Sequence, residues 1–403
     1  MSRHRRNALL ATGTVAAVVA TTFAWSSAAT AENVKAGVAV KAGDSQSAPT
    51  VTGDAKVDKL LSRMTLDEKL NMIEGQTEVA SSTKQYQAGY LPGIPRLGIP
   101  SLRLSDGPPG VVTKQDSTGM TATMGVAATF SDEDARANGK VIGSDARALG
   151  QDVVLEPFVN YDRDTSWGRG FNTFGEDPLL TSNMGAKQIE GIQSQGVMAQ
   201  VKHYIAYDGG NNVSVDDQTL HEIYLAPFAA AVKSGVSSVM CSYNAINSDS
   251  VSACGDSVTL TQILRNELGF KGFVTSDWGG NHSTLYLNAG LDMEMPGGAN
   301  GYFSATAIKA AIKAGSIQES RVTEAAGRIL YEYDKFGLLN GASKHAVTPE
   351  NRNADNKVVQ KTGEDAAVLL KNDNNTLPLS TSSSIALIGP TAGQTDATDG
   401  SGE

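Results

Sequence analysis

Short apolar runs that end in a polar or charged residue recur along the chain, and a stretch with helical spacing follows most of them. Apolar runs of this kind, bounded by turn residues, indicate buried strands, and strands that alternate with helices predict a parallel sheet. The predicted strands span residues 102–106, 153–157, 200–204, 238–243, 273–277 and 291–295.

Capping residues and apolar spacing indicate the helices. Thr65-Leu66-Asp67-Glu68 matches a capping box, and Ser131 is the predicted cap of a helix that ends at Gly150. Further helical patterns cover residues 57–64, 260–268 and 320–336. Repeated βα units closed by a last helix favour an α/β fold with a (β/α)8 TIM-type barrel. An open, doubly wound sheet is the alternative, although no G-x-G-x-x-G motif follows a predicted strand.

The first 31 residues have the features of a secretory signal peptide. Three arginines, Arg3, Arg5 and Arg6, precede an Ala/Val-rich segment over residues 8–24, and Ala29-Thr30-Ala31 is a small-residue cleavage site. The apolar segment is too short for a confident membrane span, so an uncleaved anchor is the less favoured alternative. We therefore expect a secreted protein, exported by the Sec or Tat route and cleaved near Ala31, with no membrane contact afterwards.

The rest of the chain divides by composition into four parts. Residues 32–53 are small and polar without a period, which is typical of a flexible leader. The barrel is expected over residues 54–340, and the polar stretch 341–362 is interpreted as a linker. Residues 363–403 contain one clear predicted strand, 385–390. Because so short a unit cannot bury a core alone, we interpret it as the start of an incomplete second α/β sandwich domain.

The formal net charge is −10, from 43 acidic and 33 basic residues. An acidic chain repels nucleic acid and anionic lipid, so neither is an expected partner, and a neutral sugar-like substrate fits the charge better. No phosphate-binding loop and no cluster of metal ligands stands out in the sequence, so no cofactor and no metal is expected. Cys241 and Cys254 are expected to form a disulfide in an exported protein, and a pair of buried thiols is the alternative.

Polar and aromatic residues gather at the carboxyl ends of the predicted strands, which surround one pocket in a parallel barrel. The residues placed there are Asp106, Lys202, His203, Tyr243, Asp277 and Trp278. Charged hydrogen-bonding groups beside an aromatic face suit a polyhydroxylated ring, whose apolar C–H side stacks on the indole. Taken singly, Asp277 could instead be a helix cap, and Lys202-His203 could be a solvated pair.

Five stretches of the sequence resemble glycoside hydrolase family 3, and they occur in the order typical of that family. They are residues 105–110, 162–178, 202–204, 240–244 and 275–278. The run from Trp167-Gly168-Arg169 to Gly175-Glu176-Asp177-Pro178 is the most specific of them. The similarity extends from about Leu60 to the last residue. It implies a β-glucosidase-like hydrolase of O-glycosyl bonds.

The resemblance implies a role for each site residue. Asp277 matches the family nucleophile, which forms a covalent glycosyl-enzyme and lies about 5 Å from the acid partner of a retaining mechanism. Asp106 matches the carboxylate that grips distal sugar hydroxyls, Tyr243 a residue beside the nucleophile, and Trp278 one wall of the sugar site. The cationic clamp on the ring hydroxyls is matched by Arg169, Lys202 and His203. This clamp is expected to keep nearby carboxylates ionised.

The motifs shared with the family also indicate which class of substrate is expected. Two-domain members of the family take the general acid/base from beyond the barrel, so we expect it beyond Glu403. Members that act on N-acetylglucosaminides carry a Pro-Gly-His-Gly stretch after Lys-His, and no such stretch follows Lys202-His203. β-Xylosidases tend to have Glu where Asp106 stands, so a terminal β-D-glucosyl residue is the expected substrate. One alternative is a β-xylosidase or another β-glycosidase of the same family. The other is a chain that binds sugar without cleaving it because it lacks its acid/base.

Overall fold

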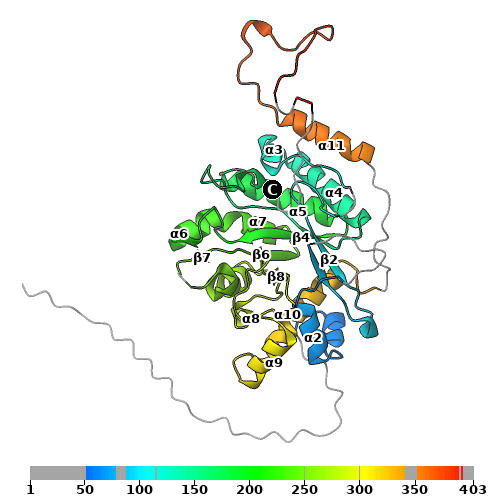
Figure 1. The fold of residues 1–403 in the computed structure, drawn as a ribbon, viewed down its shortest axis with the longest axis vertical. Coiled ribbons are helices and arrows are strands. Elements are labelled where there is room, and N and C mark those ends of the chain that lie inside the picture. The colour runs from blue at the N-terminus through cyan, green and yellow to red at the C-terminus, as the bar shows by residue number, and fades with distance from the viewer. Residues whose placement is uncertain are drawn as a thin grey trace, which may run out of the picture. The chain divides into compact units, whose positions relative to one another are not determined.

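Five parallel strands form the centre of the fold, and an antiparallel strand joins one edge (Figure 1). They are β1 (Gly89–Leu91), β2 (Leu102–Asp106), β3 (Val153–Leu155), β4 (Met198–Tyr204), β6 (Ser238–Cys241) and β8 (Phe273–Thr275), in the order β1-β2-β3-β4-β6-β8. Every residue of β3, β4, β6 and β8 is buried. Strands buried on both faces need no alternation of apolar and polar side chains, which explains the short continuous apolar runs in the sequence.

The computed structural model describes residues 51–78, 88–113, 116–248, 250–298, 300–340, 352–389 and 392–393. The predicted signal peptide, and residues 32–50 of the predicted leader, lie outside these residues. No helix in the described part of the chain is long and apolar enough to cross a membrane.

Five of the six predicted strands are present, as β2, β3, β4, β6 and β8, with ends that differ by up to two residues. The sixth prediction, 291–295, is wrong: this segment makes single bridges but forms no strand. Asp292 explains the difference. Its carboxylate accepts the backbone N–H of Val274 at 3.0 Å. A side chain therefore occupies a donor that a strand carbonyl would otherwise use.

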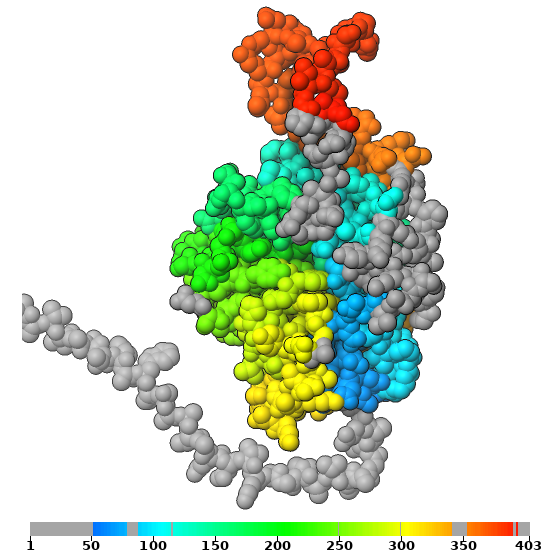
Figure 2. All heavy atoms as spheres, viewed as in Figure 1, coloured from blue at the N-terminus to red at the C-terminus, as the bar shows by residue number. Residues whose placement is uncertain are grey.

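Single bridges continue the sheet beyond β8 and lead back toward β1, so the sheet curls. Met293 bridges Thr275, the last residue of β8. Glu294 in turn bridges Glu74, also in the parallel sense. The Gln76 N–H then donates to a β1 carbonyl at 2.9 Å. In Figure 2 the first helices (blue) and a later segment (yellow) accordingly lie side by side.

Helices cover the sheet, and their starts follow the sequence signals. The main helices are α1 (Ala55–Leu61), α2 (Leu66–Ile73), α3 (Thr123–Ala128), α4 (Asp132–Ala148), α5 (Pro178–Gln193), α7 (Ala226–Lys233), α8 (Tyr286–Ala289), α9 (Ala305–Lys313) and α10 (Glu319–Lys335). The predicted capping box of Thr65 and Glu68 is present at α2, and Ser131 caps α4. The predicted helix at 260–268 forms as a π-helix, η5 (Val258–Glu267).

Shorter elements connect these helices and strands. They are η1 (Pro95–Leu97), η2 (Gly170–Asn172), β5 (Asn212–Val213), α6 (Asp217–Thr219), the π-helical η3 (Leu220–Tyr224), β7 (Ala245–Ile246) and η4 (Ala253–Gly255). β5 and β7 pair in parallel as a separate two-stranded sheet.

Helices α4 and α5 pack closely because glycines line their contact. A Cβ atom added at Gly139 would lie 2.3 Å from the carbonyl oxygen of Gln188. One added at Gly191 would lie 2.3 Å from the carbonyl oxygen of Arg136. Real Cβ atoms do not approach oxygen so closely, so any larger side chain would force the two helices apart.

The C-terminal part differs from the sequence expectation. Residues 352–362 of the predicted linker belong to a helix, α11 (Arg352–Asp365), whose Lys361 Nζ lies 2.9 Å from Asp134 Oδ1 on α4. After α11 comes a 3-10 turn, η6 (Asp373–Asn375). The described part of the predicted strand 385–390 forms no strand, and Ile388 is 92% exposed. A strand without a partner leaves its backbone groups and apolar side chains uncovered.

Candidate active site

The ends of four strands bring the predicted site residues together. Asp106 is the last residue of β2, and Lys202 and His203 lie in β4. Tyr243 follows β6 by two residues, and Asp277 follows β8 by two residues. Parallel strands that end at one edge of a curled sheet point these side chains into the same region.

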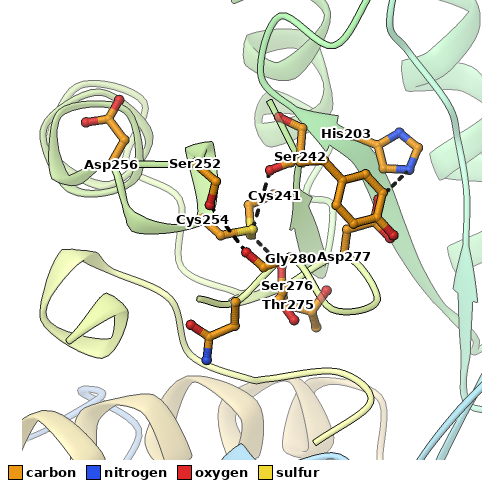
Figure 3. The surroundings of a disulfide bond; sticks show 12 residues. His203, Cys241, Ser242, Ser252, Cys254, Asp256, Thr275, Ser276, Asp277 and Gly280 are labelled. Atoms are coloured by element: carbon orange, nitrogen blue, oxygen red, sulfur yellow. Dashed lines mark hydrogen bonds and ion pairs between the residues drawn. A yellow bond between two sulfur atoms is a disulfide. The ribbon is translucent and has the colours of Figure 1, made fainter. Parts of the chain in front are cut away.

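The two carboxylate oxygens of Asp277 have different surroundings. Oδ1 accepts a hydrogen bond from the Tyr243 hydroxyl at 2.8 Å and one from the Trp278 backbone N–H at 2.7 Å. Oδ2 lies 3.3 Å from His203 Nε2 (Figure 3). It accepts no hydrogen bond from the residues that the structure describes. One oxygen therefore fixes the orientation of the carboxylate, and the other faces the cluster.

The remaining cluster residues lie beside this carboxylate. Lys202 Nζ is 3.7 Å from Asp106 Oδ1. Arg169, from the loop between β3 and α5, places Nη1 3.5 Å from His203 Nε2. Its guanidinium also stacks over the Phe158 ring, 4.7 Å from the ring centre. All residues that the sequence predicted for the site are thus brought together, including Arg169, which comes from outside the strands.

Burial decreases from the interior of this cluster toward its rim. Lys202, His203 and Asp277 are buried, whereas Asp106 and Trp278 are half-buried and Tyr243 is exposed. The Trp278 indole is held by a hydrogen bond from Nε1 to the Ala88 carbonyl at 3.1 Å. The charged groups in the interior of the cluster are therefore shielded from most of the solvent, while the residues at its rim are accessible.

Burial shifts the protonation of the interior residues. Burial raises the pKa of Asp277, although the Tyr243 hydrogen bond and the charges of Lys202 and Arg169 oppose this. Burial lowers the pKa of Lys202, against the attraction of Asp106. The positive charges of Lys202 and Arg169 favour the ionised form of Asp277, as expected of the clamp. Burial has the larger effect, so the pKa of Asp277 is raised on balance.

His203 corrects one expectation, since it was predicted to be part of a cationic clamp. Burial, together with the nearby charges of Arg169 and Lys202, lowers the pKa of His203 well below its usual value. The imidazole is therefore neutral near neutral pH, and the cations of the cluster are Arg169 and Lys202. Aromatic rings enclose it, with Phe158 at 4.8 Å and Tyr207 at 5.1 Å between ring centres.

A disulfide lies behind the nucleophile candidate. Cys241, the last residue of β6, is bonded to Cys254 in η4 (Figure 3). The Ser252 hydroxyl donates to the Gly280 carbonyl at 3.3 Å, and the Gly280 N–H donates to the Asp277 carbonyl at 2.8 Å. The disulfide thus closes the loop that carries Tyr243, and the Ser252 hydrogen bond connects this loop to the turn that carries Asp277.

Two buried residues at the site were not singled out from the sequence. Asn160 contacts the backbone and the ring of His203. Burial raises the pKa of Glu156 to about 7, although the charge of Lys202 and a hydrogen bond from Gln188 oppose this. Glu156 was visible as an acid at the end of a predicted strand. Asn160 left no such signal, because its role depends on a contact with a distant segment.

The fold and this cluster agree with the sequence resemblance, and the chain belongs to glycosyl hydrolase family 3. The N-terminal domain of that family matches residues 70–331. The chain is 37% identical over 358 residues to a β-glucosidase of Rhizobium radiobacter, covering 83% of this chain and 41% of that protein. It is 36% identical over 387 residues to β-glucosidase 1 of Aspergillus aculeatus, covering 83% and 44%.

Solved structures show the same likeness. DesR, a β-glucosidase from Streptomyces venezuelae determined in complex with D-glucose, superposes with a TM-score of 0.75 at 39% identity, covering 81% of this chain and 43% of that chain. β-Glucosidase 3B from Thermotoga neapolitana, in complex with α-D-glucose, gives a TM-score of 0.76 at 32% identity, covering 86% and 52%. The chain thus spans about half or less of the length of these relatives.

Proposed function

We propose that the whole protein is a secreted, retaining β-glucosidase that removes terminal β-D-glucosyl residues through a covalent glycosyl-enzyme on Asp277. Family membership and the β-glucosidase activity named for its relatives support hydrolysis of β-glucosides. The observation that carries the assignment of the nucleophile is the unequal surroundings of the Asp277 oxygens. Oδ1 is held by two donors, while Oδ2 faces the cluster without one among the described residues.

In the proposed first step, Asp277 Oδ2 attacks the anomeric carbon, and the bond from that carbon to the glycosidic oxygen breaks. The leaving oxygen takes a proton from a general acid, which we place beyond Glu403. Water then attacks the anomeric carbon of the ester, and the bond from that carbon to Asp277 Oδ2 breaks while the same group, now acting as base, takes a proton from the water. Two displacements return the sugar with its β configuration.

The other cluster residues would hold the sugar. Lys202 and Arg169 donate charged hydrogen bonds to ring hydroxyls, and Asp106 accepts from hydroxyls at the half-buried side of the cluster. Trp278 offers an aromatic face to the apolar side of the ring. Because these charges are shielded from water, their hydrogen bonds to a sugar gain strength.

Two architectural proposals accompany this function. The curled sheet is proposed to be a TIM-type barrel, an interpretation supported by the bridges from β8 toward β1. Residues 363–403 are proposed to begin a second α/β sandwich domain, and their exposed apolar side chains are consistent with this. The N-terminal signal features support export of the protein.

The nucleophile is tested in the whole protein with 2,4-dinitrophenyl β-D-glucoside, whose good leaving group needs little protonation. Asp277→Asn and Asp277→Ala are expected to lower kcat/KM by about 10³-fold or more. Azide is expected to restore turnover of Asp277→Ala and to yield α-D-glucosyl azide, because it enters from the face that the carboxylate has left.

The control is Asp217→Asn, which changes a side chain that is 94% exposed and lies outside the cluster. It is expected to keep the rate of the unmodified protein. Substantial turnover in Asp277→Asn would exclude Asp277 as the nucleophile. A faster rate with the corresponding β-D-xyloside would favour a β-xylosidase, and binding of glucose without any turnover would favour the sugar-binding alternative.

A further inference from the structure

Asn160 makes a paired contact with His203 behind the sugar-facing cluster. Its Nδ2 donates to the His203 carbonyl at 2.8 Å, and its Oδ1 accepts the His203 backbone N–H at 2.8 Å. Both side chains are buried, and Oδ1 also lies 3.3 Å from the ring atom Nδ1 of His203. The amide therefore contacts both the main chain and the ring of one residue.

The paired contact settles which amide atom faces the ring. Only the NH2 group can donate to the His203 carbonyl, so the atom near Nδ1 is the oxygen of Asn160. An amide oxygen accepts hydrogen bonds and donates none. A ring nitrogen at 3.3 Å from this oxygen is therefore stabilised when it carries the proton.

The contacts of Nε2, on the opposite side of the His203 ring, independently indicate that the proton is on Nδ1. Arg169 Nη1 lies 3.5 Å from His203 Nε2, and a guanidinium can only donate. Nε2 can interact favourably with this donor only as an acceptor. Asp277 Oδ2, at 3.3 Å from the same nitrogen, accepts no hydrogen bond from it.

The groups around the ring also favour its neutral form. Arg169 and Lys202 repel a proton on the imidazole, Asp277 attracts one, and the Phe158 and Tyr207 rings exclude water. The pKa of His203 is lowered well below its usual value by burial and by the two cations. A neutral ring carries one proton, so its position on Nδ1 or Nε2 decides what Nε2 can bind.

We propose that Asn160 is a positioning residue that holds His203 in the tautomer with the proton on Nδ1, so that Nε2 faces the sugar site as an acceptor. The effect of this tautomer on sugar binding and on Asp277 rests on the proposed function. A sugar hydroxyl would replace Arg169 as the donor to the single lone pair of Nε2. Asp277 Oδ2 would receive no hydrogen bond from the histidine and would stay free to attack the anomeric carbon.

The direct test is the tautomer of His203 in the unmodified chain. The protein is labelled with 15N-histidine, and long-range 15N–1H correlation spectra are recorded near neutral pH. His203→Gln identifies the signals of His203. We expect Nδ1 to show the shift of a protonated ring nitrogen and Nε2 that of an unprotonated one. A proton on Nε2, or on both nitrogens, would overturn the proposal.

Two variants test the role of Asn160 itself. Asn160→Asp keeps acceptor oxygens near Nδ1 but adds a negative charge, so His203 is expected to gain a proton and to titrate between about pH 5 and 8. Asn160→Ala removes the acceptor, so the Nδ1 proton is no longer fixed. In both, kcat/KM for 2,4-dinitrophenyl β-D-glucoside is expected to fall about 10- to 100-fold, as for other groups that orient a functional histidine.

The matched control is Asn244→Asp. Asn244 is also buried, and its Nδ2 donates to the Ile205 carbonyl at 3.2 Å, close to His203 along the chain. This variant is expected to leave the His203 signals unchanged. If the signals of His203 stay unchanged in Asn160→Asp and Asn160→Ala too, Asn160 does not set the tautomer.

The outcomes separate the two proposals. An unmodified protein that turns over no aryl β-glucoside contradicts the proposed function, while the spectrum of His203 still tests the tautomer. An active protein with the His203 proton on Nε2 contradicts the inference alone.

Discussion

Tyr243 and Asp277 form the central contact of the site at the scale of single residues. The Tyr243 hydroxyl donates to Asp277 Oδ1 at 2.8 Å and thereby lowers the pKa of a carboxylate that burial raises. The hydrogen bond thus both orients the carboxylate and favours its ionised form. In the mechanism we propose, the ionised carboxylate is the form that attacks, so this contact is expected to affect activity.

Tyr243→Phe removes this donor. We expect kcat/KM to fall about 10- to 100-fold, the equivalent of about 1.5–3 kcal/mol for a hydrogen bond to a charged group. Without the donor the pKa of Asp277 rises further, so the acid limb of the kcat/KM profile is expected to move to higher pH. The profile is measured with an aryl β-glucoside.

Tyr224→Phe is the matched control, because the Tyr224 hydroxyl donates to Asp208 Oδ2 at 2.7 Å away from Asp277. It is expected to leave the acid limb in place. An unshifted limb in Tyr243→Phe would contradict the role given to this contact.

Asp292 is a second residue whose pKa depends on the charges of its neighbours. It is fully buried and meets Arg265, Arg321 and Arg328 at 2.6, 2.7 and 2.8 Å. Burial alone would raise its pKa, but the three arginines hold it at about 2. Its native pKa lies below the unfolded value of about 3.9, so the group stabilises the fold above about pH 4. That contribution is lost as the pH falls from about 4 to about 2.

Asp292→Asn is expected to lower the free energy of unfolding by about 3–5 kcal/mol, because it leaves buried arginines without their shared carboxylate. Urea unfolding near neutral pH measures the effect. Asp132→Asn, at an exposed position in the first turn of α4, is the control and should change stability little. An equal effect of the two substitutions would show that the arginine cluster contributes nothing.

The α4–α5 contact is the clearest case at the scale of elements. Gly191→Ala would place a Cβ 2.3 Å from the Arg136 carbonyl oxygen, so the helices must separate. We expect a loss of about 1–3 kcal/mol in the free energy of unfolding, typical of overpacking. Thermal unfolding with a second probe of cooperativity measures it.

Gly363→Ala in α11 is the matched control, because a Cβ there meets nothing within 4 Å. It is expected to be neutral or to stabilise by up to about 1 kcal/mol, as alanine favours the helix. A Gly191→Ala protein as stable as the unmodified one would contradict the close approach of α4 and α5.

The disulfide between the end of β6 and η4 closes a loop over a sequence separation of 13 residues. Replacing Cys241 and Cys254 by serine is expected to lower the free energy of unfolding by about 3 kcal/mol, from the greater freedom of the unfolded chain. A reducing agent should destabilise the unmodified protein by a similar amount and leave the double variant unchanged. Equal sensitivity of the two proteins to reduction would contradict this.

Sequence patterns predicted elements well where local signals agree with their surroundings. The apolar runs that became β3 and β8 are buried along their whole length, and the predicted capping box of Thr65 and Glu68 is present. The segment 291–295 failed as a strand because the Asp292 side chain replaced a backbone partner. Residues 352–362 of helix α11 were interpreted as linker because they are mainly polar, and the contact of α11 with α4 joins segments that are distant in the sequence.

At the scale of the whole molecule, the grouping of the site residues could be predicted from the sequence, but the protonation of His203 and the role of Asn160 could not. Strand ends of a parallel sheet meet at one edge whatever lies between them, so Asp106, Lys202 and Asp277 could be grouped from their positions alone. The neutral state of His203 and the role of Asn160 depend on burial and on contacts between distant segments. Burial and such contacts are properties of the folded chain and leave no signal in the local sequence.

The most direct measurement is the identification of the residue that forms the covalent intermediate. The protein is treated with 2,4-dinitrophenyl 2-deoxy-2-fluoro-β-D-glucoside, which forms a glycosyl-enzyme without help from a general acid and hydrolyses slowly. Peptide mass spectrometry then locates the added sugar. We expect one fluoroglucosyl group, attached to Asp277 and absent from Asp277→Asn. A sugar attached to any other carboxylate, or no adduct despite turnover of the parent glucoside, would contradict the account.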